Sequence, residues 1–136
     1  MKKTIKVSEV IILYESIKNI IENDKQNIVN PNFKFKLLML LHNTLTPIYN
    51  EYENTRVSII QARGVETKNE KDEVIGMELP NDEEVINQFK ADMQDIQNND
   101  VEINFTPISA SELFSAGLDV ITCERLIKIT KEYKGE

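Results

Sequence analysis

Several residue types are scarce in this chain of 136 residues, which has no tryptophan, one cysteine, one histidine, four glycines and four prolines. Because Cys123 has no second cysteine to pair with, an internal disulfide is excluded, as is usual in a reducing compartment. Since His42 is the only histidine, a zinc site built from several imidazoles is excluded too. The glycines form neither a GxGxxG nor a GxxxxGK motif, so the sequence predicts no phosphate-binding loop.

Long hydrophobic runs are also missing. The longest, VIILY at residues 10–14 and LLMLL at residues 37–41, are far shorter than the roughly 20 residues that span a bilayer. The apolar N-terminal stretch is interrupted by Lys6, Glu9 and Glu15 and lacks a small-residue cleavage site, unlike a secretion signal. We therefore expect a cytoplasmic protein without a membrane segment.

The overall composition, 40% hydrophobic and 29% charged residues, is typical of a soluble globular protein. A chain of 136 residues supplies one hydrophobic core but little material for a second. We expect residues 1–136 to form a single domain, with a mobile acidic excursion at about residues 65–80.

The net charge of −7 is concentrated in the middle of the chain, where residues 66–100 contain 11 Asp or Glu and 3 Lys. Such a segment repels phosphate backbones and attracts basic surfaces, which argues against binding of nucleic acid. A solvated surface is the commoner role of a charge run, so solubility alone is the favoured interpretation of this segment.

The N-terminal third predicts a strand followed by a helix. Residues 4–7 alternate and are β-branched, and apolar residues then recur at spacings of three and four until about Asn23. Residues 101–105 alternate in the same way, with Val101, Ile103 and Phe105 on one face. Because a lone strand must pair, we expect these two strands to form a small antiparallel sheet.

A second apolar stripe covers residues 38–59 and keeps its phase through Pro47. An interior proline removes a backbone hydrogen bond and costs roughly 3 kcal/mol when uncompensated. We expect one long helix kinked at Pro47, with Thr44 or Thr46 satisfying the freed carbonyls and Gly64 ending the helix.

The rest of the chain is less periodic. Residues 65–80 predict a hairpin or a long excursion, after which Asn81 is expected to cap a helix with Glu84 in its first turn. The stretch 109–112 offers another capping box, and a last helix is expected at about residues 120–133.

These elements predict an α+β fold that is mainly helical, with three to four helices packed around one core and a small antiparallel sheet. The expected core residues are Val10, Ile17, Leu41, Leu45, Ile48, Phe89, Met93, Ile103, Phe105 and Leu126.

No catalytic constellation is evident. Any Ser-His-Asp triad would need His42, which sits on the long helix without a nucleophile motif to meet it. Cys123 lies among apolar helical residues, where a free cysteine behaves as a small hydrophobe. Glu83 and Glu84 are adjacent at a helix start, where helix capping explains them better than acid–base chemistry. We expect no catalytic residue, no metal ligand and no cofactor.

Most of the sequence takes part in a resemblance to a known family. The N-terminal TIKVSEVIILYESIKNII, a long helix, an acidic excursion and then DVEINFTPISASELFSAGLDVITCERLIKI together resemble a family of small proteins of unknown function from tailed bacteriophages. The resemblance implies a phage context and a small helical domain, and it supplies no catalytic residues.

We therefore expect a non-enzymatic phage protein that acts through protein–protein contacts, as a minor virion structural or assembly component. Its partners would be copies of itself or other phage structural proteins, and its location the host cytoplasm during synthesis and then the virion. The expected contact surface includes apolar side chains exposed at Leu37, Met39 and Leu118.

Two other classes stay open. A small acidic inhibitor would bind a basic nucleic-acid-binding surface of a host or defence protein, because carboxylates can mimic phosphates. The candidate mimics are Asp72, Glu73, Glu78, Asp82, Glu83 and Glu84. An unrecognised hydrolase would have to depend on His42 or Cys123.

Overall fold

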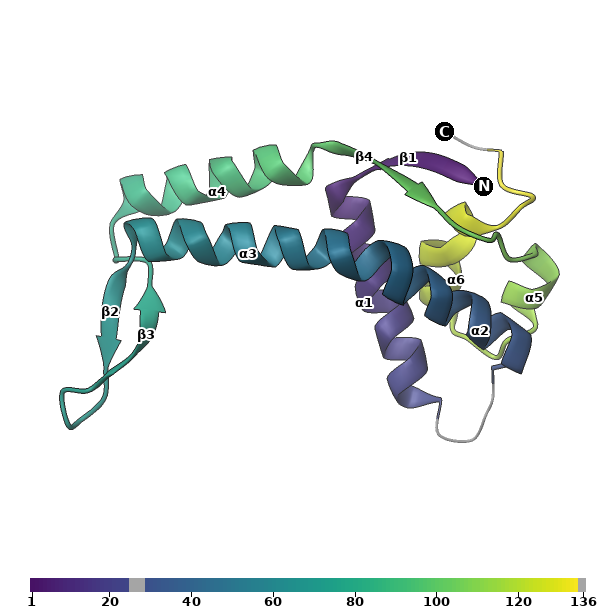
Figure 1. Ribbon diagram of the computed structural model, residues 1–136, viewed down its shortest axis with the longest axis horizontal. Coiled ribbons are helices and arrows are strands. Elements are labelled where there is room, and N and C mark those ends of the chain that lie inside the picture. The colour runs from purple at the N-terminus through teal and green to yellow at the C-terminus, as the bar shows by residue number, and fades with distance from the viewer. Residues whose placement is uncertain (25–28, 135–136) are drawn as a thin grey trace. The chain divides into compact units, whose positions relative to one another are not determined.

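The computed structural model describes residues 1–24 and 29–134. The chain divides into two compact units: unit 1 comprises Met1–Tyr49 and Asp100–Glu136, and unit 2 comprises Asn50–Asn99. The fold is α+β and 62% helical, with two small antiparallel sheets of two strands each (Figure 1). In the described residues, no helix is both long and apolar enough to cross a membrane.

The sheet of unit 1 joins its two sequence segments, Met1–Tyr49 and Asp100–Glu136. Strand β1 (Lys2–Lys6) pairs antiparallel with β4 (Asp100–Asn104), which places Ile5 opposite Val101. The amino group of Met1 extends the pairing by donating to the carbonyl oxygen of Phe105 at 2.9 Å. The predicted pairing of the two strands is therefore confirmed, although β1 begins and ends earlier than expected.

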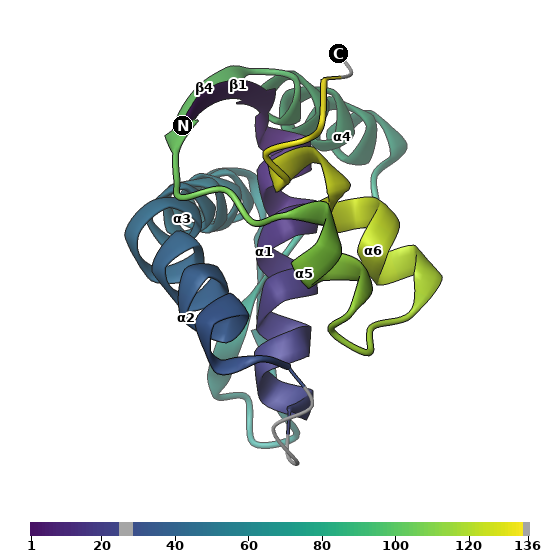
Figure 2. The same ribbon diagram turned by 90° about the vertical axis from the view of Figure 1, so that its right-hand side faces the viewer.

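Helix α1 (Val7–Asn23) ends where its sequence pattern predicts and buries the stripe Val10, Leu13, Ile17 and Ile20. Figure 2 shows α1 between α2 (Pro31–Leu40) on one side and α5 (Ala110–Phe114) and α6 (Val120–Leu126) on the other. Because α1 is covered from both sides, its apolar stripe becomes the centre of the core of unit 1.

The long helix begins at Pro31, where the side chain of Asn30 accepts a hydrogen bond from the backbone N–H of Asn32 at 2.9 Å. It continues for 33 residues through a π-helical turn (Leu41–Leu45) and α3 (Thr46–Arg63). The π turn ends two residues before Pro47, so the irregularity that proline imposes is taken up inside the helix and does not end it.

The predicted roles of Thr44 and Gly64 in this helix have different outcomes. The hydroxyl of Thr44 donates to the carbonyl oxygen of Asn104 at 2.9 Å, so the predicted role of Thr44 in satisfying helix carbonyls is wrong. The hydroxyl instead ties the π turn to β4. The helix does end before Gly64, whose N–H donates to the carbonyl oxygen of Ile60 at 2.6 Å, as the sequence predicts.

The C-terminal part of unit 1 consists of α5, α6 and a 3₁₀ turn (Ile127–Ile129). The capping box predicted at Ser109 and Glu112 is present: the N–H of Glu112 donates to Oγ of Ser109 at 3.0 Å. The last helix ends at Leu126, so the prediction of helix to residue 133 is wrong. The reason is long-range, because Thr130 forms a parallel bridge with Ile108 and the N–H of Lys131 donates to the carbonyl oxygen of Ile108.

The core belongs almost entirely to unit 1. Eight of the ten predicted core residues are buried, namely Val10, Ile17, Leu41, Leu45, Met93, Ile103, Phe105 and Leu126. Ile48 and Phe89 are only half-buried. Met93 lies in unit 2, where it is the one buried side chain of Asn50–Asn99.

Unit 2 contains the C-terminal part of α3, strands β2 (Val65–Lys68) and β3 (Val74–Glu78), and α4 (Glu83–Gln97). Arg63 forms an ion pair with Asp92, and Nε2 of Gln97 donates to Oη of Tyr52 at 2.9 Å. These contacts link α3 to α4 by their polar side chains. The cap of α4 is Asp82 and not Asn81, so that prediction is wrong by one position.

Leu45 supplies a test of the core of unit 1, because its side chain is fully buried at the π turn. Leu45→Asp would bury an unpaired charge and remove apolar packing, at a cost of about 4 kcal/mol or more. We expect the melting temperature to fall sharply or the cooperative transition to disappear. The control is His42→Asp, at an exposed position of the same turn, which should stay within about 0.5 kcal/mol of wild type.

Glu112 gives a pH-dependent test. Its carboxylate accepts a hydrogen bond from Nζ of Lys36 at 3.0 Å, and this bond is the main reason that the pKa of Glu112 is lowered. Because its pKa is lower in the folded state, its contribution to stability is present above the unfolded pKa and is lost as pH falls through the folded pKa. We expect Glu112→Gln to lose about 1 kcal/mol at pH 7 and nothing at pH 2.

Urea titrations at the two pH values measure this difference. Gln at position 112 keeps an acceptor for the capping box, so the change isolates the charge. Glu102→Gln is the matched control, since Glu102 is exposed and lies 3.9 Å from Nζ of Lys2. An equal loss for Glu112→Gln at both pH values would show that the pair with Lys36 contributes no charge-dependent stability.

Candidate functional site

The hairpin of unit 2 is organised by the side chain of Asn69. Its Oδ1 accepts hydrogen bonds from the N–H groups of Lys71 at 2.9 Å and Glu73 at 3.0 Å. Asp72 adopts a φ of 62°, a left-handed conformation that Asn and Asp tolerate better than most residues. Local side-chain chemistry therefore fixes the turn between β2 and β3 and confirms the prediction of a hairpin.

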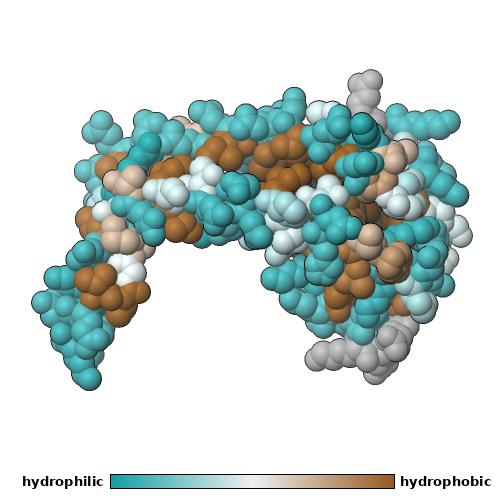
Figure 3. All heavy atoms as spheres, viewed as in Figure 1, coloured by the Kyte–Doolittle hydropathy of each residue, from teal (hydrophilic) through white to brown (hydrophobic). Residues whose placement is uncertain are grey.

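The strands of this hairpin carry hydrophobic side chains that the rest of the described chain leaves exposed. Ile75 is 65% exposed and Met77 is 37% exposed, and Val65 and Val74 are exposed as well. Figure 3 shows hydrophobic residues on the surface of the hairpin. A two-stranded hairpin on its own is marginally stable in water, because nothing covers its faces.

The two open edges of the hairpin differ. Strand β2 carries Glu66 and Lys68, and its register shifts between Thr67 and Lys68, so charge and irregularity protect its edge. All five residues of β3 are exposed and only Glu78 is charged. Strand β3 therefore lacks the usual protection against pairing with another chain.

Gly76 lies in the middle of β3. A Cβ atom at this position would meet nothing within 4 Å, so no neighbouring part of the described chain requires glycine. Glycine inside a strand often marks a place where another backbone approaches closely. The open space beside Gly76 is compatible with such an approach.

All six acidic candidate residues lie in unit 2 and are exposed. Asp72, Glu73 and Glu78 belong to the hairpin. Asp82 caps α4 by accepting hydrogen bonds from the N–H groups of Glu84 at 3.0 Å and Val85 at 3.3 Å. Asp82 thus has a structural role, and Asp72 lies 3.5 Å from Nζ of Lys68 in an ion pair within the hairpin.

Unit 2 contains 12 Asp or Glu and 5 Lys or Arg, so it carries the whole net charge of −7. Unit 1 has equal numbers of acidic and basic residues and is formally neutral. The net charge and most of the core therefore belong to different units.

The three apolar candidate residues belong to unit 1 and differ in their exposure. Leu37 is 0% exposed, so the prediction that it lies on an exposed patch is wrong: its side chain belongs to the core cluster around α1. Met39 is 44% exposed, and Leu118 is partly buried against the core. Sequence reasoning missed the exposed Phe35, four positions before Met39, although this helical spacing is a usable signal.

His42 and Cys123 are the two side chains that a hydrolase would have to depend on. His42 is exposed on the π turn. Cys123 is half-buried on α6, and burial, followed by the charge of Asp119, raises the pKa of its thiol. A raised thiol pKa disfavours the nucleophilic thiolate. Across residues 1–24 and 29–134, no group of three or more His, Cys, Asp or Glu side chains is placed to hold a metal ion.

Comparison with known proteins found no matching family model, no matching curated protein and no matching solved structure.

Proposed function

We propose that the protein acts without catalysis, through protein–protein contacts made by unit 2, as a minor virion structural or assembly component of a tailed phage. The observation that carries this proposal is the open edge of β3, a five-residue strand exposed throughout. An exposed, largely uncharged edge is a template for a further strand, since its backbone N–H and C=O groups need partners.

The partner that the strand itself fits is a second copy of the same chain. Two copies of β3 paired antiparallel about Gly76 would place Ile75 opposite Met77 of the partner subunit, and the reverse. Such cross-strand apolar pairs stabilise a sheet by about 0.2–1 kcal/mol each. The product is a four-stranded sheet, which supplies the additional strands that an isolated hairpin lacks.

The phage context rests on the sequence resemblance, and the contact surface rests on the hairpin. The charge of unit 2 sets a condition on self-association, because two acidic units repel each other at low ionic strength. Salt screens that repulsion, while apolar burial does not weaken with salt.

Ile75→Lys is expected to weaken self-association at least tenfold, because a lysine on β3 puts a charge where an apolar contact is needed. The measurement is the mass of the purified protein by light scattering after size exclusion, over a concentration series. Asn87→Lys is the matched control: it adds the same charge to unit 2 at an exposed position of α4. If wild-type protein stays monomeric throughout, or Ile75→Lys associates equally well, the pairing of β3 between copies is wrong.

The salt dependence of self-association is a second expected result. Raising ionic strength from about 0.05 M to about 0.5 M shortens the screening length from roughly 14 Å to roughly 4 Å. We expect the oligomeric fraction of wild type to rise over this range. A fall in that fraction would show that attraction between charges, and not apolar strand pairing, holds the copies together.

A second candidate function is the small acidic inhibitor of a basic nucleic-acid-binding surface. The observation that favours it is the confinement of the net charge of −7 to unit 2. An inhibitor of this kind binds by attraction of opposite charges, so its affinity falls as salt rises. The two candidate functions thus predict opposite responses to ionic strength.

A further inference from the structure

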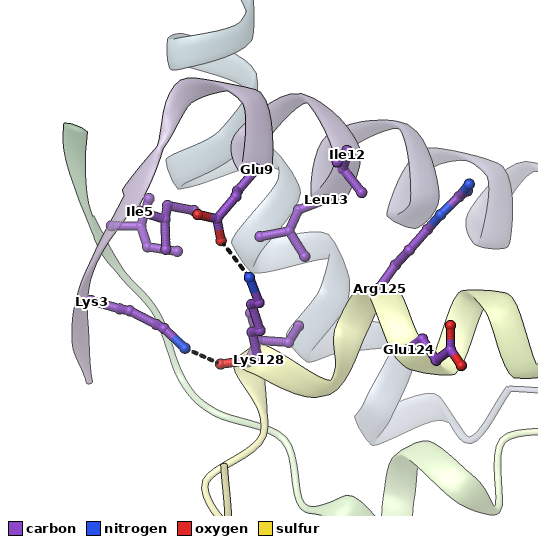
Figure 4. A pocket seen from close by; sticks show the side chains of 10 residues that line it. Lys3, Ile5, Glu9, Ile12, Leu13, Glu124, Arg125 and Lys128 are labelled. Atoms are coloured by element: carbon purple, nitrogen blue, oxygen red, sulfur yellow. Dashed lines mark hydrogen bonds and ion pairs between the residues drawn. The ribbon is translucent and has the colours of Figure 1, made fainter. Parts of the chain in front are cut away.

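Unit 1 contains a pocket of about 230 Å³ between β1, α1, β4 and the segment formed by α6 and the 3₁₀ turn (Figure 4). Its walls are mainly apolar, and the apolar side chains that line it are Ile5, Ile12, Leu13, Ile103 and Ile129. Four of these are buried core residues, and Ile12 is 46% exposed at the opening. The pocket is thus a hollow in the hydrophobic core that opens to solvent.

The charged groups at the opening include three cations and two carboxylates. Nζ of Lys128 lies 3.0 Å from Oε2 of Glu9, so one carboxylate is already neutralised by an ion pair. Nζ of Lys3 donates to the carbonyl oxygen of Lys128 at 2.9 Å, as Figure 4 shows. Burial, and then the charge of Lys128, lower the pKa of Lys3, while the charge of Glu9 acts in the opposite direction.

Arg125 is the third cation. Figure 4 shows its side chain extending from α6 toward α1. Within the described chain its guanidinium makes no hydrogen bond or ion pair of 4.0 Å or less, but its charge helps to lower the pKa of Asp119. The second carboxylate at the opening, Glu124, is its neighbour in the chain. A guanidinium presents a planar array of N–H donors that matches a carboxylate, so Arg125 is available for an anion.

The volume sets the size of a ligand. About 230 Å³ exceeds the roughly 150 Å³ of an engineered apolar cavity that holds benzene, and it is smaller than the roughly 300 Å³ at which drug-sized pockets begin. The occupant therefore has one short apolar body. The opening has three cations and two carboxylates, so a ligand with a single negative charge would neutralise it.

We infer that this pocket binds a small monocarboxylate with an apolar body. The body lies against Ile5, Leu13 and Ile129, and the carboxylate meets Arg125 at the opening. All lining residues belong to unit 1, so the inference is independent of the proposed contacts of unit 2.

Binding of 3-phenylpropionate to the full-length protein tests the inference, with the methyl ¹H–¹³C signals of the isoleucines and leucines as the readout. We expect saturable shifts at the isoleucines that line the pocket. Two probes separate charge from shape: 3-phenylpropanol keeps the apolar body without the charge, and acetate keeps the carboxylate without the body. Each should bind at least tenfold more weakly.

The variant Arg125→Gln should reduce the affinity for 3-phenylpropionate about tenfold and leave the affinity for 3-phenylpropanol unchanged. Lys18→Gln is the matched control, because it removes one exposed cation of α1 that does not line the pocket. Equal affinity for the acid and the alcohol would overturn the inference and indicate an apolar docking hollow. An unchanged affinity in Arg125→Gln, or no saturable shift at millimolar acid, would overturn it as well.

Discussion

Backbone pairing between β1 and β4 is the constraint on which the rest of unit 1 depends. It joins residues as far apart as Met1 and Phe105, which are 104 positions apart in the chain. Closing so long a loop has an entropic cost, but that cost grows only slowly with length, and burial of apolar side chains offsets it. Because Ile5 and Ile103 face the core from the paired strands, the sheet and the helices around α1 share one core.

The loop that the pairing of β1 with β4 closes contains unit 2, Asn50–Asn99. Unit 2 is inserted between two parts of unit 1 in the sequence and contributes one buried side chain, Met93. Its elements are held by local devices: the Asn69 turn, the Asp82 cap and the Arg63–Asp92 ion pair. Such interactions specify conformation well but add little stability, and the hydrophobic side chains of the hairpin stay exposed.

The separation of charge from core gives the two units different chemical character. Unit 1 is formally neutral and can hold a hollow lined by isoleucine and leucine, because its core is large enough to enclose one. Unit 2 carries the excess of carboxylates, together with the exposed hydrophobic side chains of the hairpin. Unit 2 therefore combines an excess of carboxylates with the exposed strand β3, and ionic strength affects charge repulsion and apolar contact differently.

The sequence by itself determined the features that depend on neighbouring residues: the end of α1 at Asn23, the capping box at Ser109, the stop before Gly64 and the alternation of the strand at residues 100–104. Even the partner of that strand followed, because few other strands were available. Only the tertiary structure decided the burial of Leu37, the early end of α6 and the bond from Thr44 to Asn104. It also decided the pocket, whose walls come from three separate segments of the chain, within residues 3–13, at residue 103 and within residues 124–129. The physical reason is that hydrogen bonding and turn chemistry act over a few residues, whereas burial and cavities depend on segments that meet only in the folded chain.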